Sequence, residues 1–302
     1  MPRSQRLEVD VAGRTLSLSN LGKVLYPAVG FTKGQVIDYY TRIAPVLLPH
    51  LRGRPLTLKR YPNGVDGGHF YEKQCPRHRP DWVRTAPIRA GSKVIDFCLC
   101  DDLPTLVWAA NLADLEIHPS LARAEAYASP TVVAFDLDPG PPATIVECAE
   151  VAVRLRAALR AVGLECFPKT SGSKGMQVYA PLNTPASYER TKPFAFAVAQ
   201  ALERAEPDLV VSDMKKSLRG GKVLVDWSQN DEHKTTVCVY SLRAKERPTA
   251  STPITWEEVE AVRASGDPDD LLFTSDDVLA RVAEQGDLFA PVLDLEQELP
   301  RL

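Results

Sequence analysis

The stretch that most constrains this chain is a short apolar run that ends in two aspartates. Residues 131–135 are mostly β-branched and aromatic, which predicts a buried strand. Asp136 and Asp138 follow, and side chains two apart on a strand point to the same face. Two such carboxylates repel each other unless a cation lies between them, and oxygen ligands without Cys or His suit Mg²⁺ or Mn²⁺. Pro139, with the Gly-Pro-Pro behind it, ends the strand.

A third aspartate, Asp226, ends a second apolar strand that begins at Val223. Taken alone, an Asp-x-Asp pair is a weak signal, and a solvated strand end or a turn is then the favoured interpretation. Three carboxylates with basic turns nearby in sequence, however, are the arrangement used for nucleotidyl or phosphoryl transfer with two divalent ions. The basic turns lie at residues 169–174 and 215–222 and at Arg243.

The sequence Ser-Gly-Ser-Lys-Gly at residues 171–175 lies between two predicted strands. Backbone N–H groups, hydroxyls and one ammonium group are the ingredients of a phosphate-binding turn. The spacing is not that of a P-loop, and no helix follows it. An ordinary hairpin turn rich in small polar residues is the alternative interpretation.

The composition is that of a globular protein, with 44% hydrophobic and 25% charged residues among 302. The first residues carry no apolar targeting segment and no run of 18 apolar residues occurs, so we expect neither secretion nor a membrane span. Six cysteines are scattered without a framework spacing, which is typical of a reducing cytoplasm. Cys75 and His78 have half of a zinc-site spacing, but a second matched pair is missing.

Charge is unevenly distributed along the chain. Residues 1–60 hold ten Lys or Arg against three acids, whereas residues 251–302 hold three Arg against thirteen acids. The basic front half suggests a polyanionic partner, although the two ends could simply neutralise each other.

Thr32 and Gln35 form a capping-box pattern that predicts a helix to about His50. The positive charge of Lys33 in the first turn of this helix interacts unfavourably with the helix dipole, so Lys33 either binds an anion or is solvated.

Other segments complete the expected organisation. Alternation predicts a hairpin within residues 7–18, a strand over 54–62 and a strand over 237–245. Phe70 and Tyr71 lie beside basic residues, as base stacking requires, and alternation predicts that only one of them is exposed. We expect helices over 102–115, 144–162 and 187–205, and an acidic helical tail. An extended segment over 116–119 carries His118, either as a ligand-binding or as a structural histidine.

Taken in order, these motifs resemble the polymerase domain of bacterial LigD, in the archaeo-eukaryotic primase superfamily. The resemblance runs from Ser19 to about Trp256. It includes FDLDPG at residues 135–140, KTSGSKG at 169–175, LEIHP at 115–119 and VDW at 225–227, with further segments at 48–61, 70–73 and 80–82.

The resemblance implies a role for each matching residue. Asp136, Asp138 and Asp226 would be catalytic and would bind two Mn²⁺ or Mg²⁺ ions. A DNA 5′-phosphate would be bound by Asn20, Lys23 and Lys33. The incoming nucleotide would be bound by Lys59, Phe70, Tyr71, His118, Ser171, Ser173, Lys174, Gln177, Arg219 and Arg243.

The family extends primers from nucleoside triphosphates, often preferring ribonucleotides, and fills gaps during non-homologous end joining. The resemblance therefore implies a DNA-directed primase-polymerase of the nucleotidyltransferase type. Its partners would be DNA ends and gaps with a 5′-phosphate, nucleoside triphosphates, Ku and a separate DNA ligase. We expect it in the cytoplasm, associated with the nucleoid and not with a membrane.

Two features depart from the family pattern. The second motif usually reads Ser-Gly-x-Lys-Gly-x-His, and here Gln177 takes the place of the histidine; glutamine can donate a hydrogen bond but carries no charge. The 302 residues also hold no ligase or nuclease domain, so we expect a stand-alone polymerase or partners on separate chains. A low-activity DNA-end-binding scaffold is the alternative, and a metal-dependent phosphohydrolase is a weaker one.

The resemblance also implies a fold. We expect a mixed α+β protein with a primase-like catalytic core, in which central sheets are flanked by helices. The whole chain would form a single primase-polymerase domain with a basic DNA-binding portion over about 1–120, the catalytic core over about 130–246 and an acidic cap over about 250–302.

Overall fold

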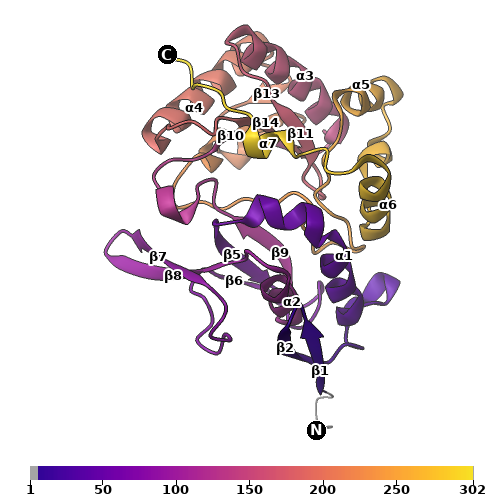
Figure 1. Cartoon of the computed structure of the whole chain (residues 1–302). Coiled ribbons are helices and arrows are strands. Elements are labelled where there is room, and N and C mark those ends of the chain that lie inside the picture. The colour runs from indigo at the N-terminus through magenta and orange to yellow at the C-terminus, as the bar shows by residue number, and fades with distance from the viewer. Residues whose placement is uncertain (1–5, 302) are drawn as a thin grey trace. The chain divides into compact units, whose positions relative to one another are not determined.

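The computed structural model describes residues 6–301, and the chain divides into two compact units. The first unit combines the chain up to Ser120 with Val237–Ala250 and Thr274–Gly286. The second combines Leu121–Thr236, Ser251–Phe273 and the segment from Asp287 onward. Both units mix helices with sheets, as predicted for the fold class (Figure 1). No helix within residues 6–301 is long and apolar enough to cross a membrane.

The second unit contains β10 (Val132–Pro139), α3 (Ile145–Ala161), β11 (Phe167–Thr170), β12 (Met176–Pro181), α4 (Tyr188–Ala205), β13 (Val210–Val211), β14 (Val223–Asp226), α5 (Trp256–Ser265) and α7 (Pro291–Asp294). Its sheet has the order β11–β12–β10–β14–β13. Neighbouring strands are antiparallel, except that β13 and β14 are parallel. The predicted strand with the two aspartates is thus the central strand of this sheet.

One face of this sheet is apolar and is covered by α3 and α4. Val133, Phe135 and Leu137 alternate along β10 and are fully buried in a core that also contains apolar residues of both helices. The helix expected over 144–162 is α3, and Thr144 caps it in a capping box with Glu147. Since alternate residues of a strand face opposite ways, this core directs Asp136 and Asp138 to the opposite face.

The first unit contains β1 (Arg6–Val11), β2 (Arg14–Ser19), β3 (Val24–Tyr26), β4 (Phe31–Thr32), α1 (Lys33–Leu51), β5 (Pro55–Arg60), β6 (Phe70–Glu72), β7 (Thr85–Ala90), β8 (Lys93–Leu99), α2 (Leu103–Asn111), β9 (Asp114–Pro119) and α6 (Ser275–Gln285). β9 pairs with one edge of β5. Along the other edge, β8 pairs with Pro55 and Leu56 of β5, and β6 pairs with Leu58, Lys59 and Arg60. The β7–β8 hairpin extends beyond the rest of this sheet (Figure 1).

Helix α1 begins where the sequence predicts. Thr32 accepts a hydrogen bond from the backbone of Gln35, whose side chain bonds back to Thr32. Its buried face carries Tyr39 and Tyr40, whose hydroxyls donate to the backbone oxygens of Tyr240 and Leu115 at 2.8 Å each. The helix therefore fixes β9 and the segment 237–250 within the first unit.

Two predicted elements differ from the structure. The helix expected over 102–115 ends at Asn111, because Ala113 has a φ of 59° and turns the chain directly into β9. The strand expected over 237–245 is an irregular segment in which Tyr240 has a φ of 65°. Its backbone groups form isolated hydrogen bonds and not a strand ladder. For example, the N–H of Cys238 donates to the carbonyl of Ile117 at 2.9 Å.

The cysteines also differ from expectation. Cys75 and Cys98 form a disulfide that joins the segment after β6 to β8, which also excludes Cys75 as a zinc ligand. The backbone N–H of Cys75 donates to the carbonyl of Asp96, so the two segments are already in register. The 23-residue separation shows no framework spacing, and only the pairing of β5 with both strands brings the two sulfurs together.

Candidate active site

Four polar side chains form a row across the second unit's sheet. Asp136 of β10 lies directly opposite Gln177 of β12 on one side and opposite Asp226 of β14 on the other. Gln177 in turn lies opposite Lys169 of β11. Residues that are directly opposite in an antiparallel pair share a face, so the row is Lys169, Gln177, Asp136 and Asp226. The predicted aspartates are thus brought together by strand register.

Asp138 adds a third negative charge two residues further along β10, opposite Leu224. Burial, together with the charges of Asp138 and Asp226, raises the pKa of the Asp136 carboxyl to about 7. A hydrogen bond from Gln177 and the charge of Lys169 offset part of this rise. The site therefore carries an excess of negative charge at neutral pH, which a cation would neutralise.

The position of Asp226 depends on the turn that follows β14. Its Oδ1 accepts from the backbone N–H of Ser228 at 2.8 Å, and its Oδ2 accepts from Gln229 at 3.1 Å. Within residues 6–301, no three His, Cys, Asp or Glu side chains lie close enough together to form a metal-holding group. A carboxylate has about four lone-pair positions, so Asp226 can keep these hydrogen bonds and still bind a cation.

Asn230 is a fully buried residue that the sequence reasoning missed. Its side-chain amide accepts from the N–H of Ala134 at 2.9 Å and donates to the carbonyl of Ala134 at 2.7 Å, where β14 no longer pairs with β10. It also donates to the carbonyl of Trp227. Asn230 thus continues the ladder of β10 and holds the turn after Asp226. A polar residue four positions after a strand-terminal aspartate was the available signal.

The turn at residues 171–175 is held tightly against β10. The hydroxyl of Ser171 accepts from the N–H groups of Ser173 and Gly175, at 3.2 Å each, whereas Lys174 is exposed. A Cβ atom on Gly175 would lie 2.0 Å from the carbonyl oxygen of Leu137. Ser171, Ser173 and Lys174, which are predicted to bind nucleotide, thus lie in a tight hairpin turn beside the aspartates.

Gln177 and Arg219 are the remaining residues of the second unit that are predicted to bind nucleotide. The Gln177 amide donates to the hydroxyl of Thr236 at 3.0 Å, and its buried Oε1 has no hydrogen-bond partner among the described residues. Arg219 donates to the carbonyl of Met214 at 2.6 Å. Its own carbonyl oxygen lies so close to Gly140 that a Cβ there would come within 1.8 Å. Both residues therefore adjoin the ends of β10 and β12.

In the first unit, Phe70 and Tyr71 are both exposed, at 43% and 59%. The prediction that only one would be exposed is wrong, because β6 is an edge strand with solvent on both faces. Tyr71 lies opposite Lys59, whose Nζ is 5.4 Å from the centre of its ring. Phe70 lies opposite Arg60, on the other face. The two aromatic rings thus belong to different surfaces.

Glu116 of β9 joins three residues predicted to bind nucleotide. Its carboxylate is buried and lies 3.1 Å from Lys59, 3.1 Å from His118 and 3.2 Å from Arg243. Burial opposes its charge, but the hydrogen bond from His118 and these positive charges hold the pKa of Glu116 well below its usual range. Burial lowers the pKa of His118. The alternation of Asp114, Glu116 and His118 on one strand face was the signal for this cluster.

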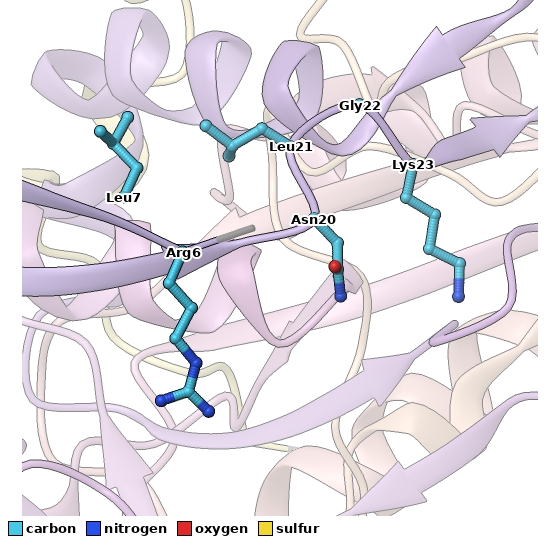
Figure 2. Close-up of a pocket in the computed structure, with 6 residues that line it drawn as sticks. All are labelled: Arg6, Leu7, Asn20, Leu21, Gly22 and Lys23. Carbon is cyan, nitrogen blue, oxygen red and sulfur yellow. The ribbon is translucent and has the colours of Figure 1, made fainter. Parts of the chain in front are cut away.

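Asn20 and Lys23, both predicted to bind a 5′-phosphate, line one pocket of about 750 Å³. Arg6 of β1, which was not predicted, lines it too, and Figure 2 shows the side chains of Arg6, Asn20 and Lys23 projecting to the same side. Asn20 has a φ of 54°, and its carbonyl accepts from the N–H of Lys23. The ammonium of Lys23 bonds to the carbonyl of Pro62 at 2.6 Å. The rest of the lining is Leu7, Leu21 and Gly22.

Lys33 lies beside this pocket, at the start of α1. Its N–H donates to the carbonyl of Lys23 at 2.8 Å, and its ammonium group lies 3.3 Å from the hydroxyl of Ser19. Burial and the positive charges of Lys23 and Arg60 lower the pKa of Lys33 to about 8. Lys33 is 6% exposed, so its side chain is not solvated as one alternative expected, while binding of an anion stays a prediction. A cluster of like charges at a helix N-terminus is a ready anion site.

These features define a class of protein with a mixed α+β fold. One unit carries a cluster of carboxylates, and the other carries basic and aromatic side chains. A family model described as "LigD, primase-polymerase domain" matches residues 32–289. The chain therefore belongs to the LigD primase-polymerase family.

Individual relatives agree with this assignment. The chain is 44% identical over 277 residues to the multifunctional non-homologous end joining protein LigD of Mycolicibacterium smegmatis, covering 91% of this chain and 36% of that protein. It is 32% identical over 272 residues to the bifunctional LigD of Bacillus subtilis, covering 90% of this chain and 43% of the relative. The chain thus spans less than half the length of these relatives.

A solved structure is similar over nearly the whole chain. It is the polymerase domain of Mycobacterium tuberculosis ligase D in complex with DNA, with a TM-score of 0.86 and 43% identity. The match covers 92% of this chain and 98% of the solved one. The predicted fold class and family are confirmed by these comparisons.

Proposed function

We propose that this protein is a metal-dependent, DNA-directed primase-polymerase that acts at DNA ends and gaps in non-homologous end joining. The row that places Asp136 opposite Asp226, with Asp138 two residues on, is the single observation that carries the proposal. Membership of the LigD primase-polymerase family supports a nucleotidyltransferase, and the similar solved domain was bound to DNA.

Asp136, Asp138 and Asp226 would hold two Mn²⁺ or Mg²⁺ ions. The fit rests on an all-oxygen donor set and on the strand register that groups the three carboxylates; burial and the charges of Asp138 and Asp226 raise the pKa of Asp136. When bound, such ions would supply activation of a primer 3′-hydroxyl and charge neutralisation for a pyrophosphate leaving group. The chain's own task is to hold the three carboxylates in place, and Asn230 and the turn at residues 171–175 do so from two sides.

Each unit, taken by itself, carries proposed nucleotide contacts. Lys59, His118 and Arg243 present cationic or hydrogen-bonding groups to a triphosphate or a sugar, and Tyr71 on the same face offers a ring for stacking. Phe70 lies on the opposite face and would contact the template. In the second unit the proposed contacts are Ser171, Ser173, Lys174, Gln177 and Arg219. We further propose a preference for ribonucleotides, which the family resemblance implies.

The DNA end would be held by Asn20, Lys23 and Lys33. Lys33 supports this role because burial and two neighbouring cations, Lys23 and Arg60, lower its pKa, and a bound phosphate would offset the repulsion among the three cations. A 5′-phosphate carries close to two negative charges at pH 7, which distinguishes it from an internal phosphodiester. Ku and a separate DNA ligase are proposed partners, since the relatives are described as end-joining proteins.

The decisive test is primer extension on a gapped duplex with a 5′-phosphate at the distal side. Mn²⁺ and either ribo- or deoxyribonucleotides would be supplied to the wild type, Asp138→Ala and Gln177→His. Extension that requires metal and is lost in Asp138→Ala is expected, and the better nucleotide set reports the sugar preference. A matched duplex with a 5′-hydroxyl measures the contribution of the phosphate.

The Gln177→His variant distinguishes a second outcome of this test. It lies opposite Asp136, and its buried Oε1 lacks a hydrogen-bond partner within the described residues. If the wild type fails to extend a primer while Gln177→His succeeds, the second motif has lapsed in an intact fold. If no variant extends a primer but 5′-phosphate binding persists, the protein is a DNA-end-binding scaffold.

A further inference from the structure

Glu116 occupies the centre of a buried cluster to which no role has been assigned so far. The residue is 1% exposed. Its Oε1 lies 3.1 Å from Lys59, 3.1 Å from the hydroxyl of Tyr61 and 3.2 Å from the backbone N–H of Ala244. Its Oε2 lies 3.1 Å from His118 and 3.2 Å from Arg243.

The arrangement joins three separate parts of the first unit through one side chain. Lys59 comes from β5, His118 from β9 itself, and Arg243 from the segment 237–250. Lys59 and Arg243 are long side chains with many rotamers, and a shared buried anion restricts both to a single geometry. Their side chains remain 12% and 15% exposed, so each keeps an accessible part.

The charge of the cluster also favours a ligand. Lys59 and Arg243 carry two positive charges against the single negative charge of Glu116. Burial lowers the pKa of His118, so His118 is neutral at pH 7. The cluster is therefore net positive while each cation is held by an ion pair. Stability alone does not require such a cluster, because apolar residues often replace buried ion pairs without loss.

We propose that Glu116 is a positioning residue that orients Lys59, His118 and Arg243 for binding a nucleoside triphosphate. This inference rests on the nucleotide-binding role proposed above for these three residues. Glu116 itself is too buried to touch the nucleotide, and it acts through the cations it holds.

The first experiment compares Glu116→Gln with Asp114→Asn. Asp114 is a matched control because it lies two residues earlier on the same strand and is equally buried, and burial raises the pKa of its carboxyl well above the usual range. Glu116→Gln should raise the KM for the nucleotide about tenfold or more, with a smaller change in kcat. Binding of DNA with a 5′-phosphate should stay within about twofold, and Asp114→Asn should change neither quantity by more than about twofold.

Two readouts separate positioning from a merely structural role. In a double-mutant cycle, Glu116→Gln should have less than about a third of its effect on KM once Lys59→Met is present, whereas additive effects would overturn the proposal. The pKa of His118, followed by NMR, should fall in Glu116→Gln, because a negative neighbour is lost. The other groups that face His118 are Lys59, Arg243 and Tyr71, and they are unchanged in that variant.

If Glu116→Gln does not fold, Glu116→Asp provides the test. It keeps the charge but shortens the side chain by about 1.5 Å, one carbon–carbon bond, so the same rise in KM is expected. An unchanged KM in a folded Glu116→Asp or Glu116→Gln overturns the inference. Lys59→Met and Arg243→Met check its premise: if neither raises KM, the proposed nucleotide site is wrong, and if both do while Glu116→Gln does not, only the role of Glu116 is wrong.

Discussion

Replacing Gly175 with alanine should displace the strand that carries two of the aspartates. The added Cβ would lie 2.0 Å from the carbonyl oxygen of Leu137 and 3.0 Å from Cδ of Pro139, whereas ordinary contacts begin at 3.4 Å. The turn and β10 would have to separate by about 1.4 Å to restore an ordinary contact with that oxygen. Leu137 lies between Asp136 and Asp138, so both carboxylates move with the backbone.

The magnitude follows from two general relations. Overpacking of this kind costs about 1–3 kcal/mol of folding free energy. A displacement of about 1 Å in a catalytic group costs about a hundredfold in rate, so primer extension should fall by at least that factor. Denaturant unfolding and single-turnover extension measure the two effects separately. Extension should fall far more than the population of folded protein.

Gly220→Ala is the matched control, because a Cβ atom added at Gly220 would meet nothing within 4 Å and the backbone there is not left-handed. It should change the free energy of unfolding by less than about 1 kcal/mol and leave extension intact. If Gly175→Ala matched Gly220→Ala in both measurements, the argument that this close approach positions the aspartates would be refuted.

Three further predictions concern other parts of the molecule. With a pKa of about 8, Lys33 is about nine-tenths charged at pH 7 and about one-tenth at pH 9, so 5′-phosphate binding should weaken over this range in the wild type but not in Lys33→Arg. Because its folded pKa lies below the unfolded value, Lys33 contributes a rise in stability as pH increases from about 8 to 10.5. Asn230→Ala should cost about 2–4 kcal/mol in denaturant unfolding, because it leaves buried backbone groups of β10 without partners. Reducing Cys75–Cys98, which closes a loop of about 23 residues, should lower the free energy of unfolding by about 3 kcal/mol, measured with and without dithiothreitol.

Several elements of both units could be predicted because their signals are local. The strand ending at Asp138, the capping box at Thr32, the helix beginning after Thr144 and the strand ending at Asp226 all depend on neighbouring residues. Bringing the three aspartates together also requires that the two strands pair, which these local signals do not show. The register that places Asp136 opposite Asp226 was not predictable from either strand alone.

The errors and omissions involve contacts between distant parts of the chain. Residues 237–245 have the alternation of a strand. The Tyr39 hydroxyl, however, donates to the carbonyl of Tyr240, and the N–H of Leu242 donates to the Tyr40 hydroxyl, so the segment is held in an irregular form. The Cys75–Cys98 disulfide depends on the pairing of two strands with β5. Glu116 was overlooked because its partners come from residues 57 positions before and 127 positions after it. Local propensity carries no information about such partners.

The division of the chain has a consequence for how the protein is made. The polypeptide passes from one unit to the other five times, and the first unit includes residues as late as Gly286. A ribosome that has released only the first 120 residues has delivered Lys59 and Glu116 but not Arg243. The charge cluster around Glu116 is therefore assembled late in translation, after most of the second unit has emerged. For the same reason no single cut separates the units, and an exchange of the first unit between relatives would have to transfer three segments together.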